Sequence, residues 1–227
     1  TYEYRNIGTA LDKFNQENRS SNLVRYYDGG SPTALWAVRS LGINPSDGRE
    51  LFLTKEGTYT FEYDTEDEVV VGNSEPKLEG VLGSTLYWKG FSFSLYFRYS
   101  LGADVFTEAT YNKVENISLA GLKNNQDKRA LHDRWQKPGD HAKFKGISLT
   151  ETTPISSRFV LRENYIKAES ISVGYDFESQ AVQKLGIQSL RLQANTTDLF
   201  RISSIKEERG IEYPFARSFS FSLSAMF

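Results

Sequence analysis

The chain has 227 residues, with 27 Lys and Arg against 29 Asp and Glu, which gives a formal net charge of −2. Nucleic-acid binding normally shows as a clustered excess of basic residues, so this balance argues against a nucleic-acid partner. Cysteine is absent, which excludes disulfides, thiolate metal sites and cysteine nucleophiles. Aromatic residues make up 14% of the chain and hydrophobic residues only 39%. This combination of many rings with a polar chain is unusual.

A helical membrane span is excluded by the lengths of the apolar runs. Such a helix needs about 18 or more consecutive apolar residues, and the longest uninterrupted run is Ala34 to Val38. The opening stretch TYEYRNIG is polar and lacks the charged and apolar regions of a signal peptide. We therefore expect the chain either to be cytosolic or to begin downstream of its targeting segment.

The N-terminal third is predicted to form one short helix and several short strands. Turn signals at Asn44-Pro45 and Asp47-Gly48 separate two of the strands. The predicted elements are a helical turn near Ala10 to Asn15 and strands at about 35–43, 50–54 and 59–63.

An acidic run, Glu62 to Glu68, follows these strands and offers carboxylate oxygens to a calcium ion. It lacks the regular spacing and the central glycine of a known calcium loop. A solvated hairpin tip is therefore the favoured interpretation. We expect no metal site in the chain.

Four later segments alternate between apolar and polar residues, which is the pattern of a strand with one apolar face. The polar faces carry mostly serine, with an occasional arginine such as Arg98 or Arg191. In the three longer segments the alternation lasts about 9 to 11 residues, which is the length that a tilted strand needs to cross a bilayer. The segments are FSFSLYFRYS (91–100), ESISVGYDF (169–177), SLRLQAN (189–195) and RSFSFSLSAMF (217–227).

Two fold classes compete for this pattern. A soluble β-sandwich also alternates, but its strands usually run about 5 to 6 residues and carry more Lys, Glu and Thr on the outer face. In a membrane barrel, rings near the strand ends form girdles at the headgroups. The rings expected there are Tyr87, Trp88, Phe91, Tyr99, Phe106, Tyr175, Phe177, Phe200 and Phe215. The barrel is favoured, and a soluble or surface glycan-binding β-sandwich remains the alternative.

The connections between strands differ strongly in length, as in outer-membrane barrels with short inner turns and long outer loops. Trp88-Lys89-Gly90-Phe91 predicts a tight hairpin, whereas the stretch 107–155 is long, charged and rich in turn formers. A loop of this length is uncommon in a compact domain and is usually functional. Its predicted local elements are a helix at about Asp127 to Trp135 and a turn at Pro138-Gly139-Asp140. A further short helix is predicted at Ser179 to Leu185, ending at Gly186.

Binding is the function that the long loop favours. Trp135 supplies a ring for stacking, and Asp133, Arg134 and Asp140 supply charged hydrogen-bonding groups, a mixture found in sugar and peptide sites. The structural alternative is that Trp135 pins the loop to the barrel rim while Arg134 pairs with a local carboxylate.

No catalytic constellation is present in the sequence. The histidines, His132 and His141, lie among loop charges and are interpreted as solvated rather than as metal ligands or acid/base groups. Phosphate-binding glycine loops and nucleophile elbows do not occur. We expect a protein that is not an enzyme and that carries no cofactor.

The chain resembles the C-terminal part of the SusC/RagA family of TonB-dependent outer-membrane transporters. The resemblance runs along nearly all of its length in family order and ends on a terminal aromatic residue. The matching stretches are ALWAVRSLGINPSDGRELF (34–52), VGNSEPKLEGVLGSTLYWKGFSFSLYFRYSLGADVF (71–106), DKRALHDRWQKPGD (127–140), SSRFVLRENYIKAESISVGYDF (156–177), LRLQANTTDLFRIS (190–203) and YPFARSFSFSLSAMF (213–227).

The resemblance implies an all-β fold, namely the C-terminal strands of an antiparallel transmembrane β-barrel of about 22 strands around a plug, with long extracellular loops and short loop helices. Residues 1–75 are expected to form outer-loop hairpins and strands, and 76–106 a transmembrane hairpin. Residues 107–155 are expected to form a long extracellular loop, and 156–227 the final transmembrane strands. The plug and N-terminal domains of the family are absent from the sequence, so the chain is expected to be a segment of a longer polypeptide.

The implied function is import of oligosaccharide or peptide across the outer membrane of a Gram-negative bacterium. The implied partners are a SusD-like surface lipoprotein, the TonB complex through regions outside this chain, and outer-membrane lipid, with a dimer of the transporter and lipoprotein pair. Arg98 and Arg191 are expected to face the lumen, where they contact the plug or line the path. The last strand is expected to carry the assembly signal in Phe219, Phe221, Leu223 and Phe227.

Overall fold

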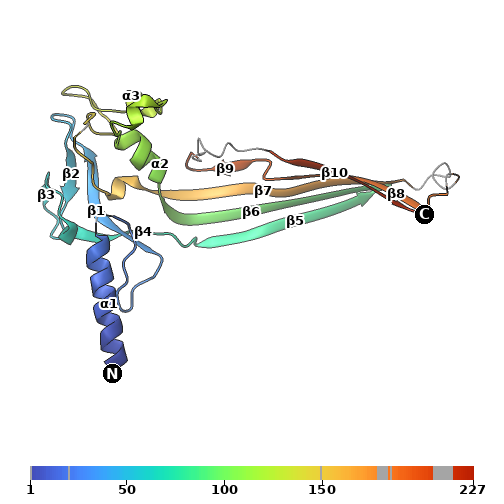
Figure 1. Ribbon diagram of the computed structural model, residues 1–227, viewed down its shortest axis with the longest axis horizontal. Coiled ribbons are helices and arrows are strands. Elements are labelled where there is room, and N and C mark those ends of the chain that lie inside the picture. Colours follow the sequence, from blue (N-terminus) through green and yellow to red (C-terminus); the bar gives the residue numbers. More distant parts are fainter. Residues whose placement is uncertain (1, 20, 149, 178–183, 185, 207–216) are drawn as a thin grey trace. The chain divides into compact units, whose positions relative to one another are not determined.

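The computed structural model describes residues 2–19, 21–148, 150–177, 184, 186–206 and 217–227. The chain forms two compact units (Figure 1). The first, here called the loop unit, comprises Thr1–Glu75 and Ala103–Arg162. The second, here called the strand unit, comprises Pro76–Gly102 and Glu163–Phe227.

The loop unit begins with helix α1 (Tyr2–Asn18), which is longer than the helical turn predicted at Ala10 to Asn15. The helix is attached to the following segment near its C-terminal end. Phe14 packs against Tyr26 with ring centroids 5.5 Å apart. The side chain of Asn15 donates to the carbonyl of Tyr26 at 2.7 Å and accepts from the backbone N–H of Tyr26 at 2.9 Å. These contacts fix the helix end against the chain that leads into the first strand.

The sheet of the loop unit has the strand order β3-β2-β1-β4. The strands predicted at 35–43 and 50–54 are confirmed, whereas the strand predicted at 59–63 is only two residues long. Apolar residues of the first strand form part of the buried core of the unit. The strands are β1 (Ala34–Ile43), β2 (Glu50–Leu53), β3 (Tyr59–Thr60) and β4 (Glu68–Asn73).

The acidic run forms a short 3-10 helix, Thr65–Asp67, and then enters β4. Glu62 and Glu66 are exposed, as predicted for a solvated tip. The prediction is wrong for Glu68, which is buried and pairs with the buried Arg25 at 2.7 Å. A carboxylate can be buried in this way because the guanidinium compensates its charge. In the described parts of the chain, no group of three or more acidic or histidine side chains is arranged to hold a metal ion.

The stretch between strands β6 (Phe91–Phe106) and β7 (Val160–Phe177) folds into short helical pieces around a small core. The helix predicted at Asp127 to Trp135 is confined to four residues. The core consists of Val114, Ala130, Phe144 and Phe159. Phe106, one of the predicted girdle residues, packs against this core, and its ring centroid lies 5.6 Å from that of Tyr111. The pieces are α2 (Glu108–Thr110), a π-helix (Tyr111–Glu115), α3 (Arg129–His132), and 3-10 helices at Gly121–Lys123 and Ser157–Phe159.

The strand unit is built on a six-stranded sheet with the order β10-β8-β7-β6-β5, and β9 also pairs with β7. The pairs β5–β6, β7–β8, β7–β9 and β8–β10 are antiparallel. Three of the four alternating segments of the sequence lie within these strands, and the fourth forms β10 over Phe219–Met226, as predicted. The strands are β5 (Leu78–Trp88), β6 (Phe91–Phe106), β7 (Val160–Phe177), β8 (Ser189–Thr197), β9 (Arg201–Ser203) and β10 (Phe219–Met226).

The tight hairpin predicted after Trp88 is confirmed. Trp88 pairs with Phe91, and the two residues between them, Lys89 and Gly90, have φ angles of 48° and 83°. Positive φ at both central positions is the requirement of the two-residue turn that matches the twist of paired strands. The predicted helix at Ser179 to Leu185, apart from Lys184, and the predicted girdle residue Phe215 lie outside the described residues.

Apolar side chains of the strand unit are largely exposed. Phe91 and Phe93 on β6 are exposed, whereas Ser92 and Ser100 on the opposite face of that strand are buried. Contiguous apolar surface of this kind marks a surface that contacts a partner or a membrane. In the described part of the chain, no helix has the length and apolar character to cross a membrane. Other exposed apolar residues of these strands include Leu82, Leu86, Trp88, Val173, Leu192, Phe219, Phe221 and Leu223.

Candidate ligand-binding sites

The predicted loop residue Arg134 is buried, with 5% of its surface exposed. Its Nε donates to the carbonyl of Ala130 at 2.9 Å and its Nη1 to the carbonyl of Lys145 at 2.9 Å. Its Nη2 donates to the carbonyls of Val114 and Glu115. Burial lowers the pKa of Arg134, although the nearby Glu115 opposes this effect. Arg134 therefore ties three loop segments together through backbone carbonyls.

The neighbouring Trp135 joins the loop to the turn that connects β1 and β2. Its indole Nε1 donates to the carbonyl of Pro45 at 2.9 Å. The ring also lies against Gly48, where a β-carbon would come within 2.5 Å of ring atoms. The other two predicted residues make contacts within the loop: Asp133 lies 4.0 Å from the ammonium of Lys143 at the surface, and Asp140 accepts from two backbone N–H groups.

A pocket of about 430 Å³, here called the loop pocket, opens beside Trp135. Arg134 and Trp135 both line it, whereas Asp133 and Asp140 do not. Leu131 is an exposed apolar residue of its wall. His132 and His141 lie outside it and are exposed, as predicted. The full lining is Ala130, Leu131, Arg134, Trp135, Gln136, Gly146 and Ile147.

A buried ion network, which the sequence analysis missed, fixes the base of the loop. The guanidinium of Arg158 pairs with Glu50 of β2 at 2.9 Å and with Glu115 at 2.9 Å. Ser156 and Thr153 donate further hydrogen bonds to these carboxylates at 2.6 Å and 3.0 Å. Burial by itself lowers the pKa of Arg158, but the hydrogen bonds and charges of Glu115 and Glu50 outweigh it and raise the pKa. The two carboxylates therefore favour the charged form of the arginine.

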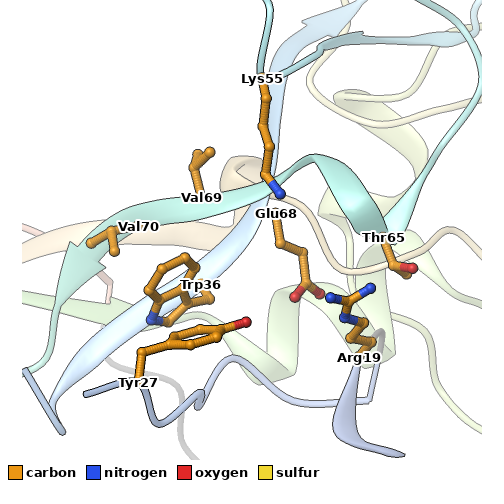
Figure 2. Close-up of a pocket in the computed structure, with 8 residues that line it drawn as sticks. All are labelled: Arg19, Tyr27, Trp36, Lys55, Thr65, Glu68, Val69 and Val70. Carbon is orange, nitrogen blue, oxygen red and sulfur yellow. The ribbon is translucent and has the colours of Figure 1, made fainter. Parts of the chain in front are cut away.

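A second pocket, here called the Trp36 pocket, has a volume of about 450 Å³ and was also missed. Figure 2 shows the rings of Trp36 and Tyr27 along one side of it and Lys55, Glu68 and Arg19 along the other. The two rings lie 4.9 Å apart with planes tilted by 52°. Trp36 sits in the apolar run that predicts a buried strand, so the sequence carries no signal that it reaches a pocket. The full lining is Arg19, Tyr27, Trp36, Lys55, Thr65, Glu68, Val69 and Val70.

The two arginines predicted to face a lumen are both held by partners in the strand unit. Arg98 pairs with Glu169 of β7 at 2.8 Å. Arg191 of β8 donates to Ser92 of β6 at 3.0 Å, reaching across β7 at Gly174. A β-carbon at Gly174 would come within 2.5 Å of the Ser92 hydroxyl. The absence of a side chain at Gly174 therefore leaves room for Arg191 to reach Ser92 over β7.

The last strand, β10, pairs with β8 along its whole length, from Phe219 opposite Thr196 to Met226 opposite Ser189. It forms one end of the strand order. One edge of β10 therefore has no partner strand among the described residues, and such an edge is a template for pairing with another strand. The predicted assembly residues Phe219, Phe221, Leu223 and Phe227 are all exposed.

The sequence of the chain was compared with those of known proteins. No protein-family model matches the chain. It is 24% identical over 163 residues to the TonB-dependent receptor P39 of Formosa agariphila, covering 69% of this chain and 15% of that protein. It is 24% identical over 173 residues to the TonB-dependent receptor P3 of the same organism, covering 76% of this chain and 16% of that protein.

The fold matches solved structures of RagAB. The TM-score is 0.66 to a structure of the RagAB peptide transporter, with 16% identity, covering 78% of this chain and 20% of that one. It is 0.63 to the RagAB peptide importer in its 'open-open' state, with 16% identity, covering 78% of this chain and 19% of that one. The chain thus shares the antiparallel β fold of part of RagAB and is similar in sequence to TonB-dependent receptors, in line with the SusC/RagA resemblance of the sequence.

Proposed function

We propose that this chain supplies barrel wall, outer loops and the C-terminal assembly strand of an outer-membrane, TonB-dependent importer of oligosaccharides or peptides. The observation that carries the proposal is the exposed apolar face of the long antiparallel strands, in a fold shared with part of RagAB. The chain spans about one sixth of the curated receptors that it matches. The activity proposed here is therefore that of the whole polypeptide, to which this chain contributes.

In this proposal the apolar faces of β5 to β8 and β10 contact lipid, and the serine and arginine faces line the lumen. Arg98 pairs with Glu169 at 2.8 Å and Arg191 with Asp176 at 3.6 Å. These pairs support an inner face that is hydrated and on which the arginine charges are balanced by carboxylates. A charge turned toward lipid would cost about 2 to 4 kcal/mol at the bilayer midplane. The arrangement of the arginines on the serine face avoids that cost.

The proposed roles of the residue ranges are those expected from the sequence. Residues 1–75 and 107–155 lie outside the cell, and 76–106 and 156–227 cross the membrane. The loop pocket, with Arg134 and Trp135 in its wall, contacts the ligand or a SusD-like surface lipoprotein. Energy comes from the TonB complex through parts of the polypeptide outside this chain, and two transporter and lipoprotein pairs form a dimer. We propose no catalytic role, because the proteins that the chain resembles are named receptors, importers and transporters.

The test is growth and uptake in a strain that lacks the gene encoding this chain. We expect the deletion to abolish uptake of one class of oligosaccharide or peptide, complementation to restore it, and removal of TonB to abolish it again. Uptake that persists without TonB would contradict the proposal. Purification of the full chain as a detergent-free soluble monomer would instead support the β-sandwich alternative.

The contribution of the loop pocket is tested with Trp135→Ala in the complemented strain. We expect weaker binding of ligand or lipoprotein with a normal level of assembled barrel. Unchanged affinity for both would show that Trp135 only pins the loop to the turn after β1.

A further inference from the structure

We propose that the loop pocket selects an uncharged, bulky apolar side chain, such as that of phenylalanine or leucine, in a peptide that the whole polypeptide imports. The inference rests on the proposed import function for the source of the peptide, and it adds the part of the ligand that this site recognises. All residues that line the pocket belong to the loop unit. Its volume of about 430 Å³ lies within the range of about 300–1,000 Å³ that is usual for small-ligand sites.

The polar side chains of the lining direct their donors at the protein itself. Arg134 donates from Nε, Nη1 and Nη2 to four backbone carbonyls. Trp135 donates from Nε1 to the carbonyl of Pro45 at 2.9 Å, and Gln136 donates from Nε2 to the carbonyl of Leu131 at 3.4 Å. A sugar or another polar ligand would have to displace these bonds, and a buried carbonyl that loses its donor costs free energy. Hydrogen bonding therefore does not favour a polar ligand at this site.

The surface that remains for a ligand is apolar. Leu131 and Ile147 line the pocket and are 61% and 54% exposed. Ala130 and the ring of Trp135 add to this apolar lining. Covering exposed apolar side chains with another apolar group removes both from water, which is favourable in proportion to the area buried. An aromatic or branched aliphatic side chain supplies that area in one piece.

Arg134 is the charged residue of the described lining, and its charge is balanced within the protein. Glu115 lies near Arg134 and opposes the lowering of its pKa by burial. Glu115 and Glu50 both pair with Arg158 at 2.9 Å. The two guanidinium groups and the two carboxylates therefore form a buried group without net charge. Among the described residues, the lining thus offers no free charge, and an ionised ligand would lose its hydration there without gaining a partner.

The rim of the pocket, here defined as the residues of the segment 127–147 outside the lining, carries charges of both signs. Asp127 pairs with Arg129 at 2.6 Å, and Asp133 lies 4.0 Å from the ammonium of Lys143. The other charged rim residues are Lys128, Lys137, Asp140 and Lys145. With three lysines against one aspartate the rim has an excess of positive charge, which salt screens beyond about 8 to 10 Å. The salt dependence of binding therefore separates the effect of the rim from that of the apolar lining.

The segments that line the pocket are held together before any ligand arrives. Residues 130–131 and 146–147 line it from two parts of the loop. Arg134 donates to the carbonyls of Ala130 and Lys145 at 2.9 Å each, so its guanidinium bridges these two parts. A preformed site loses less free energy on binding than a site that must be ordered. Arg134 is thus a positioning residue of the site rather than a contact for an anion.

A peptide side chain fits this site better than the surface of a folded lipoprotein. A stable interface between two proteins takes about 20–30 residues on each side. The described lining of the pocket has seven residues, which suits one bulky side chain rather than a folded surface. The pocket is therefore assigned to the imported peptide, and docking of the lipoprotein is a separate outcome of the test.

The test is calorimetric titration of the full polypeptide, as its gene encodes it, in lipid nanodiscs, where no detergent competes for an apolar site. The probes are capped peptides Gly-Gly-X-Gly-Gly, in which X is Phe, Ala or Glu, and the trisaccharide maltotriose. We expect the Phe peptide to bind at least about tenfold more tightly than the other probes. Its binding should show a negative change in heat capacity and should change less than about twofold between low and high salt.

Two variants test whether the apolar lining is the contact. Leu131→Ala and Ile147→Ala should each weaken binding of the Phe peptide roughly fivefold, because less apolar area is covered. Both side chains are exposed, so both substitutions leave the fold intact. The matched control is Leu119→Ala, since Leu119 is 63% exposed in the same connection but does not line the pocket. This control should leave binding unchanged.

No binding of the Phe peptide, equal binding of the three peptides, or binding that Leu131→Ala and Ile147→Ala leave unchanged would overturn the proposal. Tighter binding of the Glu peptide that is lost at high salt would assign recognition to the rim charges instead. Binding of maltotriose with the same dependence on Leu131 would assign the pocket to sugars. If the two variants weaken co-purification of the lipoprotein but not peptide binding, the pocket is a docking site for that partner and the proposal fails.

Failure of this inference is distinguishable from failure of the proposed function. Peptide binding as predicted, without TonB-dependent uptake, would refute the proposed function alone. TonB-dependent uptake by a protein whose peptide binding is insensitive to both variants would refute the inference alone.

Discussion

The indole ring of Trp135 lies directly on the backbone of Gly48, so close that a β-carbon on the glycine would come within 2.5 Å of ring atoms Cδ2 and Cε3. The glycine also has a φ of 73°, a backbone conformation that residues other than glycine rarely adopt. The turn between β1 and β2 and the long loop are therefore shaped to fit one another.

Substitution Gly48→Ala is expected to destabilise the loop unit by more than the cost of the backbone strain alone. Overpacking of a filled site typically costs about 1 to 3 kcal/mol in addition. The matched control is Gly29→Ala, since Gly29 has a φ of 72° but a β-carbon added there would have no atom within 4 Å. Thermal unfolding of the two variants measures the difference, and equal losses would show that Trp135 moves away without cost.

Removal of the guanidinium at Arg158 is expected to be among the most damaging changes in the loop unit. Arg158→Met leaves Glu50 and Glu115, whose side chains are 2% and 0% exposed, without their counter-ion. Breaking a buried pair in this way typically costs about 3 to 5 kcal/mol. The control Arg49→Met removes an exposed partner of Asp47 and should cost less than about 1 kcal/mol. A small effect of Arg158→Met in thermal unfolding would mean that water reaches the two carboxylates.

The loop unit is expected to lose stability at alkaline pH through Tyr63. Burial, followed by the charge of Glu68, raises the pKa of Tyr63 from 10.0 to about 12. Because the folded pKa lies above the unfolded value, this stabilisation is complete below about pH 10 and is lost as the pH rises toward 12. The measurement is the thermal midpoint of the wild type and of Tyr63→Phe across this interval. The wild type should lose more stability than the variant, and parallel curves would contradict the assignment to Tyr63.

Deletion of Phe227 is expected to lower the amount of the full chain in the outer membrane. Phe227 is exposed and follows the residues of β10 that pair with β8, which run from Phe219 to Met226. Its loss should therefore affect assembly rather than the fold of the sheet. Quantitative immunoblotting of membrane fractions measures the effect. Substitution Phe227→Tyr keeps a terminal ring and serves as the control, and normal levels after the deletion would count against an assembly role.

The regular strands of this chain were predictable, whereas its pockets were not. The alternation in FSFSLYFRYS defines β6 because strand periodicity is written in adjacent residues. Trp36 and Lys55 come from different strands and connections, and nothing local in the sequence places them beside Tyr27. Arg25 and Glu68 are 43 residues apart, so their buried pairing depends on the order of the sheet.

The long loop shows the same division. The residue types in DKRALHDRW identify a loop with a ring and charges, and two of the four candidates do line a pocket. The sequence does not show that Arg134 is buried against four backbone carbonyls, because backbone acceptors leave no trace in residue identity. The helix predicted there has only four residues, Arg129–His132.

The most direct test of the central claim, that the strands cross the outer membrane and the loop lies outside, is cysteine labelling in intact cells. The chain has no cysteine of its own, so His141→Cys in the loop and Leu82→Cys on the exposed apolar face of β5 report single positions. With a membrane-impermeant maleimide, we predict rapid labelling of His141→Cys and protection of Leu82→Cys until detergent is added. Equal labelling of both variants in intact cells would contradict the account. So would a result in which neither variant is labelled before lysis and both are labelled after lysis without detergent.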